Sequence, residues 1–181
     1  MSDKIFLREH LALRPFEPDD NPNLVRYLND PTIYRNTQNI PSPYTEVDAN
    51  WWIHHVREIY EQHGVHTNQA ICHDEHGVIG GIGCFLHTGF EGHRDEIGYW
   101  LAEPFRGQGI ATDAVEVFCN WLLAIRPALV RIEAKVYSHN PASARVLEKA
   151  GFQREGLARK LVFKDGAYID AILLSRLREG S

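Results

Sequence analysis

The sequence has few cysteines and no long hydrophobic run, and each shortage excludes a class of protein. Only three cysteines occur among 181 residues, at wide spacing, which argues against a disulfide-stapled secreted scaffold and favours reduced thiols in a cytoplasmic protein. No apolar run approaches the roughly 20 residues that a membrane-spanning helix needs. The first ten residues alternate in charge without an apolar segment, so we expect no signal peptide and no membrane partner.

An excess of basic residues is missing as well. Nineteen Lys and Arg face 24 Asp and Glu, which gives a formal net charge of −5. Proteins that bind duplexes normally carry a basic surface, so we expect no nucleic-acid partner. A mildly acidic balance suits a cationic partner such as an amine. The 44% hydrophobic content is enough for one buried core, and we expect one domain over residues 1–181.

Strand and helix patterns alternate along most of the chain. Apolar residues at every second position predict strands, and apolar residues three or four apart predict helices. Strands are predicted at 11–16, 67–72, 78–86, 96–101, 130–137, 152–164 and 167–177. Helices are predicted at 24–28, 45–63, 109–125 and between Asn140 and Gly151, with a loop at 34–44. This order predicts an α/β fold around one mixed sheet.

The most informative segment runs from Arg106 to Gly109 and joins a strand to a helix. Glycines let the backbone approach a ligand, and the first N–H groups of a helix attract phosphate oxygens. Ala111 and Thr112 follow where a dinucleotide loop has its third glycine, and no Gly-Lys-Ser/Thr ends the segment as in a Walker loop. A tight turn without a ligand is the alternative.

Arg106, Gly109 and Ala111 form the pattern Arg-x-x-Gly-x-Ala, which resembles the pyrophosphate loop of the GNAT superfamily of N-acetyltransferases. A second block reads Asn-Pro-Ala-Ser from Asn140 and Glu-Lys-Ala-Gly-Phe up to Phe152. It is similar to a signature of the RimJ/RimL-like branch, which acetylates protein N-terminal amines. The likeness extends over nearly the whole chain and its order of elements.

The resemblance implies a single GNAT-like α+β domain, with a mixed, mostly antiparallel sheet and about four helices. It also implies acetyl-CoA as the co-substrate and no metal. The backbone N–H groups implied to hold the pyrophosphate are those of Arg106, Gly107, Gln108, Gly109, Ile110 and Ala111. The strand backbone implied to pair with the pantetheine arm is that of Tyr99, Trp100 and Leu101. Asn140 is implied to hydrogen-bond pantetheine, and Ser143 to lie near the sulfur.

The implied reaction is transfer of an acetyl group to a primary amine by direct attack in a ternary complex. A protein or peptide N-terminal α-amine is the expected acceptor, and a polyamine, amino sugar or antibiotic is the alternative. A CoA-binding module without catalysis is the alternative of another class. A homodimer through the sheet edge at 152–177 is a further expectation.

Glu96 is the preferred general base, because a period of two places it on one face of the cofactor strand with Gly98 and Trp100. Glu133 on the next strand is its competitor. Ser143 is expected to return a proton to the CoA thiolate, with Tyr137 as the alternate. A catalytic base is needed because the amine must attack in its neutral form.

Two weaker expectations concern the acceptor and a metal. Residues that could contact the acceptor are Tyr34, Arg35, Asn36, Tyr44, Trp51 and Trp52, although a core position is favoured for Trp52. Ligand types for zinc cluster at Cys72, His73, His76, Cys84 and His87. We expect no metal there, because no Cys-x-x-Cys occurs and regular hairpin pairing places Cys84 beyond the partner of Cys72.

Overall fold

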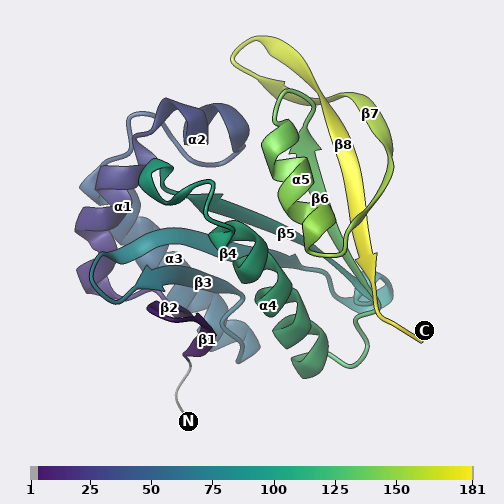
Figure 1. Cartoon of the computed structure of the whole chain (residues 1–181), viewed down its shortest axis with the longest axis horizontal. Coiled ribbons are helices and arrows are strands. Elements are labelled where there is room, and N and C mark those ends of the chain that lie inside the picture. Colours follow the sequence, from purple (N-terminus) through teal and green to yellow (C-terminus); the bar gives the residue numbers. More distant parts are fainter. Residues whose placement is uncertain (1–3, 181) are drawn as a thin grey trace. The chain divides into compact units, whose positions relative to one another are not determined.

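The computed structural model describes residues 4–180 and contains one mixed sheet with five α-helices (Figure 1). The order of strands in the sheet is β1-β2-β3-β4-β5-β6-β8-β7. The strands are β1 (Ile5–Arg8), β2 (Leu11–Arg14), β3 (Asn68–His73), β4 (Gly77–Leu86), β5 (Arg94–Leu101), β6 (Arg131–Tyr137), β7 (Gln153–Lys164) and β8 (Ala167–Leu177). The helices are α1 (Asn21–Leu28), α2 (Pro31–Asn36), α3 (Glu46–His63), α4 (Ile110–Ile125) and α5 (Pro141–Lys149). The fold is thus mixed α/β, and its sheet is mostly antiparallel.

The expected strands and long helices form, with two differences near the N-terminus. A strand that the sequence did not predict, β1, pairs antiparallel with β2. The expected loop at 34–44 is wrong in its first part, because α2 extends to Asn36. Pro31 starts this helix at its first position, and the Asp30 side chain accepts a hydrogen bond from the Thr32 N–H at 2.7 Å. The Asp-Pro pair therefore begins a helix as well as following one.

The chain forms two compact units, and β4 and β5 contribute residues to both. The first unit comprises the described residues up to Gly83 together with Tyr99–Ile110. Its core joins α1, α2 and α3 to strand residues, and Phe16, Trp52 and Trp100 pack against it at the margin. The fully or nearly buried members are Leu24, Leu28, Ile33, Tyr44, Ala49, Ile53, Ala70 and Val78. Apolar burial of this kind contributes about 25 cal/mol per Å².

The second unit comprises Cys84–Gly98 and the described residues from Ala111 onward. Here α5 lies against β6, β7 and β8 (Figure 1), and the apolar stripe of α4 is buried, with Phe118 and Leu122 fully inaccessible. Arg126, just after α4, forms an ion pair with the fully buried Asp95 of β5. A buried carboxylate needs such a partner, so this pair ties the end of α4 to the sheet.

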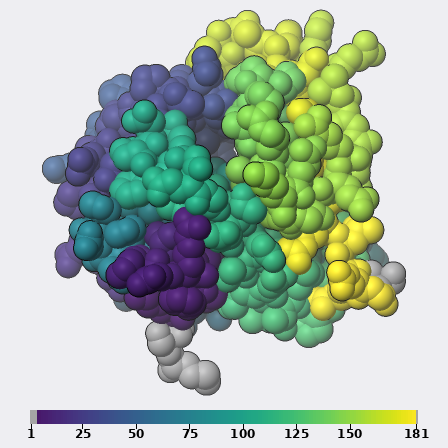
Figure 2. Space-filling model, in the orientation of Figure 1, coloured from purple at the N-terminus to yellow at the C-terminus, as the bar shows by residue number. Residues whose placement is uncertain are grey.

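The β7–β8 hairpin forms the last edge of the sheet, and its yellow-green and yellow surface is prominent in Figure 2. Large apolar side chains are exposed on it at Leu157, Leu161, Phe163, Tyr168 and Leu177. An uncovered edge strand can pair with a strand of another chain. The homodimer expected through this edge stays a prediction. Within the described residues, no helix combines the length and apolar character required to cross a membrane.

Candidate cofactor and active site

The glycine loop from Arg106 to Gly109 lies on the surface between β5 and α4. Gly107 and Gly109 have positive φ values of 77° and 81°, a left-handed conformation that favours glycine. A Cβ atom on Gly107 would meet nothing within 4 Å, and one on Gly109 only the Arg8 guanidinium at 3.8 Å. The left-handed backbone therefore explains why glycine occupies both positions. The open space beside them leaves room for a ligand near the start of α4.

The Arg106 side chain turns away from the start of α4 and braces the loop. Its Nε donates to the Leu101 carbonyl at 2.9 Å, and its Nη2 donates to Oδ2 of Asp30 at 2.6 Å. The Arg106 guanidinium charge is thus neutralised by a carboxylate. The Arg106 backbone N–H donates to the Glu103 carbonyl at 3.2 Å, so a phosphate that contacts it has to share or replace this hydrogen bond.

Asp30 performs two structural tasks with its two oxygens. Oδ1 accepts from the Thr32 N–H and caps α2, whereas Oδ2 accepts from Arg106. Burial alone would raise the pKa of Asp30, but the Thr32 hydrogen bond and the Arg106 guanidinium outweigh it and hold the pKa below its usual value. The charged carboxylate therefore links the glycine loop directly to the start of α2.

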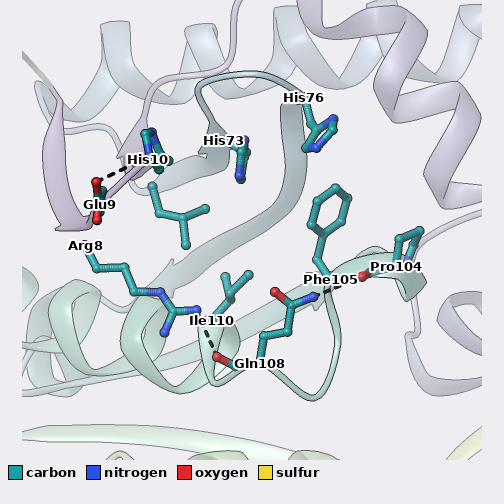
Figure 3. Close-up of a pocket in the computed structure, with 10 residues that line it drawn as sticks. Arg8, Glu9, His10, His73, His76, Pro104, Phe105, Gln108 and Ile110 are labelled. Carbon is teal, nitrogen blue, oxygen red and sulfur yellow. Dashed lines mark hydrogen bonds and ion pairs between the residues drawn. The ribbon is translucent and has the colours of Figure 1, made fainter.

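A second brace reaches the loop from β1. Arg8 Nη2 donates to the Gln108 carbonyl at 2.9 Å, and Gln108 Nε2 donates to the Pro104 carbonyl at 3.1 Å (Figure 3). Ile110, the first residue of α4, is 3% exposed and anchors the other end of the loop. The loop is held at both ends while its glycines stay on the surface. Such preorganisation lowers the ordering cost of binding.

The strand that leads into the loop is held by close backbone packing. A Cβ atom on Gly81 would lie 2.7 Å from Nε1 of Trp100, and one on Gly80 would lie 2.7 Å from the Trp100 carbonyl oxygen. Only glycine therefore fits at these two β4 positions. The Trp100 side chain is committed to this packing, so its backbone is the part that a cofactor could contact.

β5 and β6 run parallel. They pair over three pairs of residues, and the last pair is Glu96 with Glu133. β5 nevertheless continues to Leu101. The implied pantetheine residues, Tyr99 to Leu101, thus lie beyond the segment of β5 that pairs with β6. Extended backbone of this kind can accept an added strand-like ligand.

The two candidate bases, Glu96 and Glu133, are direct neighbours in the second unit but differ in their partners. Glu133 accepts from Arg131 at 2.6 Å and from Arg94 at 3.1 Å. Burial would raise the pKa of Glu133, yet the two arginines reverse the effect and lower it. Glu96 accepts a hydrogen bond from Lys135 at 2.6 Å and, among the described residues, has no arginine partner. Glu133 is therefore the poorer base of the two.

The start of α5 carries the remaining candidates. The Asn140 side chain accepts from the Ser143 N–H at 3.3 Å, and Pro141 occupies the first helical position, as the sequence predicts. Tyr137 at the end of β6 is 6% exposed, and its hydroxyl has no hydrogen-bond partner among the described residues. Burial raises its pKa, so the phenol keeps its proton at neutral pH.

The expected acceptor-contacting residues separate into core and surface positions. Tyr44 is 5% exposed and belongs to the core of the first unit, and Trp52 packs against that core, as favoured from the sequence. Trp51 is 62% exposed and stacks on His55 at 4.8 Å between ring centroids. Tyr34, Arg35 and Asn36 lie on α2, which Asp30 connects to the glycine loop.

The five-residue zinc set weighed from the sequence has two unsuitable thiols. In the β3–β4 hairpin Cys72 pairs with Val78, so Cys84 lies further along β4. Burial raises the pKa of Cys72 to about 12 and that of Cys84 still further, whereas a thiol must lose its proton to bind zinc. All three cysteines are unpaired thiols.

Sequence reasoning missed Asp30 and Arg8 as the residues that brace the loop. The signal for Asp30 was present, since Asp-Pro is a recognisable helix start. Its ion pair with Arg106 joins residues 76 positions apart, and one sequence does not reveal such a contact. The same holds for Arg8, which is 100 positions from Gln108.

With this geometry established, comparison with known proteins identifies the family. Residues 10–153 match the acetyltransferase (GNAT) domain family. The uncharacterized N-acetyltransferase p20 of Bacillus licheniformis is 33% identical over 171 residues, covering 94% of each chain. The L-amino acid N-acetyltransferase AaaT of Escherichia coli is 23% identical over 173 residues, covering 93% of this chain and 98% of AaaT.

Among solved structures, the ribosomal-protein-S5-alanine acetyltransferase of Vibrio fischeri has a TM-score of 0.83 and 27% identity, covering 97% of each chain. The family match includes the glycine loop and most of the strands of the sheet, and the similarity to the solved structure extends over nearly the whole chain. The chain belongs to the GNAT family of acetyl-CoA-dependent N-acetyltransferases, in which it is similar to the RimJ/RimL ribosomal-protein acetyltransferases.

Proposed function

We propose that this N-acetyltransferase transfers acetyl from acetyl-CoA to the α-amine of a protein or peptide N-terminus. The observation that carries the cofactor part is the braced glycine loop, where two left-handed glycines precede α4. Backbone N–H groups from Arg106 to Ala111 bind the pyrophosphate, helped by the positive end of the helix dipole. Tyr99 to Leu101 pair with the pantetheine arm, Asn140 hydrogen-bonds it, and a β5 amide stabilises the oxyanion.

Chemistry and relatives both support an α-amine acceptor. An α-amine has a pKa of about 7.7–8.0, so roughly a tenth of it is neutral at pH 7, whereas lysine at about 10.4 is almost fully charged. The Vibrio fischeri relative is named for an alanine of a ribosomal protein. AaaT is named for free L-amino acids, which makes a free amino acid the second candidate acceptor.

Glu96 acts as the general base, directly or through a water molecule. Its side chain is 22% exposed and ion-paired with Lys135, so it is positioned while still reachable from solvent. We expect Glu96→Gln to lower kcat by about 100-fold or more, as removal of a general base does, without weakening acetyl-CoA binding. Glu133→Gln is the matched control, and it should leave the pH–rate profile of transfer unchanged.

Ser143 returns the proton to the departing CoA thiolate, and Tyr137 is the alternate donor. The comparison of Ser143→Ala with Tyr137→Phe decides between them by kcat at constant acetyl-CoA affinity. The thiolate is a good leaving group, so the expected loss in kcat is below about 100-fold, which is the lower end for general acid catalysis. We also propose a cytoplasmic location, supported by the three unpaired thiols.

An acceptor screen that follows release of the CoA thiol tests this proposal. The panel contains peptides starting with Ser or Ala, the same peptides with blocked N-termini and an internal lysine, free amino acids, and polyamines. Turnover only with unblocked peptides is the expected result. Turnover with free amino acids alone favours the second candidate. Acetyl-CoA binding without transfer to any amine would identify a non-catalytic binding module.

A further inference from the structure

We propose that the β3–β4 turn of the first unit binds a divalent transition ion, such as Zn²⁺, through His73, Glu75 and His76. One ligand atom from each of these side chains lies within 4.8 Å of the others. Two imidazoles and a carboxylate form a known ligand set for zinc sites that keep a position open for water. The set shares two histidines with the one weighed from the sequence, but its third ligand is a carboxylate in place of the thiols of Cys72 and Cys84.

The turn that carries these residues is already fixed without an ion. The His76 N–H donates to the His73 carbonyl at 3.2 Å, and the Asn23 side chain donates to the His76 carbonyl at 2.7 Å. Gly77 closes the turn with a φ of 66° and pairs with His73 across the hairpin. Because the backbone is preorganised, the ordering cost of metal binding falls mainly on three side chains.

Neighbouring aromatic rings hold the two imidazoles close together. The ring centroids of His73 and His76 are 4.7 Å apart, and His76 lies 5.4 Å from the ring of Phe105. Both histidines line a cavity of about 360 Å³, and Gln108 of the glycine loop lines the same cavity (Figure 3). Glu75 and His76 are exposed and His73 is half-buried, so an ion and its water ligands can enter.

Closing the site requires small movements and the loss of one hydrogen bond. Tetrahedral ligands about 2.0–2.1 Å from zinc are roughly 3.4 Å apart, so the side chains must rotate inward by an ångström or more. His73 Nδ1 accepts from the Glu75 N–H at 3.1 Å. Ligation through either nitrogen of His73 breaks this bond, which lowers the affinity for the ion.

The charges around the turn also moderate the affinity. The Arg8 guanidinium lines the same cavity and opposes a cation, whereas Glu9 lines it with the opposite charge. Three ligands, one open position and these costs place the expected Kd in the micromolar range, well short of the affinity of closed four-ligand zinc sites. Glu96, Asn140 and Ser143 contribute no ligand to this set, so metal binding does not depend on the catalytic assignment.

The test is calorimetric titration of chelator-treated, full-length protein with ZnCl₂. We expect one ion per chain, with binding weakened at least tenfold by His76→Ala and by Glu75→Gln. His63→Ala removes an exposed histidine at the end of α3 and is the matched control, with unchanged affinity. Co²⁺ in place of zinc should give the visible absorption of a nitrogen- and oxygen-ligated ion, and this absorption should be lost in His76→Ala.

Two results would overturn the proposal: no stoichiometric zinc binding by the wild-type chain, or an equal loss of affinity in His63→Ala and His76→Ala. Circular dichroism and the midpoint of thermal unfolding show whether each variant is folded, independently of any ligand. Loss of acetyl-CoA binding with retained zinc binding would contradict the proposed function and leave the metal site standing.

Discussion

The helices α4 and α5 begin in opposite ways. Asn140 caps α5 with its own side chain, and Pro141 fills the first position, so the helix start is satisfied from within the chain. α4 is preceded by Gly109, which has no side chain to accept a hydrogen bond, and the chain braces the surrounding loop instead. A helix start that is fixed in position and has glycine as its N-cap residue is suited to bind an anion.

Substitution of Gly109 should have the largest effect on acetyl-CoA binding at the start of α4. Gly109→Glu forces a side chain onto a left-handed backbone and places a negative charge where phosphate binds. Loss of two charge-assisted hydrogen bonds, each about 1.5–3 kcal/mol, weakens acetyl-CoA binding at least about 100-fold. Titration calorimetry measures the effect.

Gly89→Glu provides the control for that variant. Gly89 also has a positive φ, 62°, and open space around its Cβ position, so backbone strain and added charge are matched. Its acetyl-CoA affinity should equal that of the wild type. Equal weakening in both variants would show that strain, and not phosphate contact, explains the result at Gly109.

The Asp30 brace should have the next largest effect. Asp30→Asn keeps an oxygen that can cap α2 but removes the charge that holds Arg106, whereas Asp30→Ala removes both. We expect Asp30→Asn to raise the KM for acetyl-CoA by about tenfold, equivalent to 1.4 kcal/mol, and to lower the midpoint of thermal unfolding slightly, because the ion pair with Arg106 is lost. Asp30→Ala should have the same effect on KM and lower the midpoint of thermal unfolding further, because the cap of α2 is lost as well. An unchanged KM in both variants would remove the brace from the account.

The glycine loop was predictable because its pattern is local, and the same is true of the helices that begin near Thr45 and Asn140. The start of α2 at Pro31 was not predicted, because it depends on Asp30, Arg106 and the core around Ile33. β1 is short and carries exposed residues such as Phe6, so its alternation of apolar and polar residues is weak and only pairing with β2 reveals it.

The choice between Glu96 and Glu133 required knowledge of their ion-pair partners. Long-range contacts of these kinds lie outside what local patterns encode.

Removal of the α5 cap should have a smaller effect than the loop variants. Asn140→Ala leaves the Ser143 N–H without its acceptor and should lower the free energy of unfolding by about 1 kcal/mol. Asn140→Asp restores the cap but not the amide donor proposed for pantetheine. Chemical denaturation of both, together with acetyl-CoA titration, separates the two roles. If Asp restores acetyl-CoA affinity fully, Asn140 acts only as a cap.

The smallest expected effect is the acid sensitivity of the side-chain-capped helix starts. Thr45 and Asp48 form a capping box at α3, and hydrogen bonds from Thr45 lower the pKa of Asp48; the pKa of Asp30 is lowered as well. A depressed pKa stabilises the fold fully above about pH 4, and the contribution is lost as the pH falls through the folded-state value. Asp48→Asn should therefore flatten the pH dependence of stability below about pH 4. An unchanged slope in that variant would contradict the assignment.

Hydrogen exchange of backbone amides with and without acetyl-CoA tests most directly whether the start of α4 is the cofactor site. We predict that saturating acetyl-CoA slows exchange from Gly107 to Ala111 and leaves the capped start of α3, from Glu46 to Asp48, unchanged. Tight binding of acetyl-CoA with no change in exchange at Gly107 to Ala111 would contradict the account.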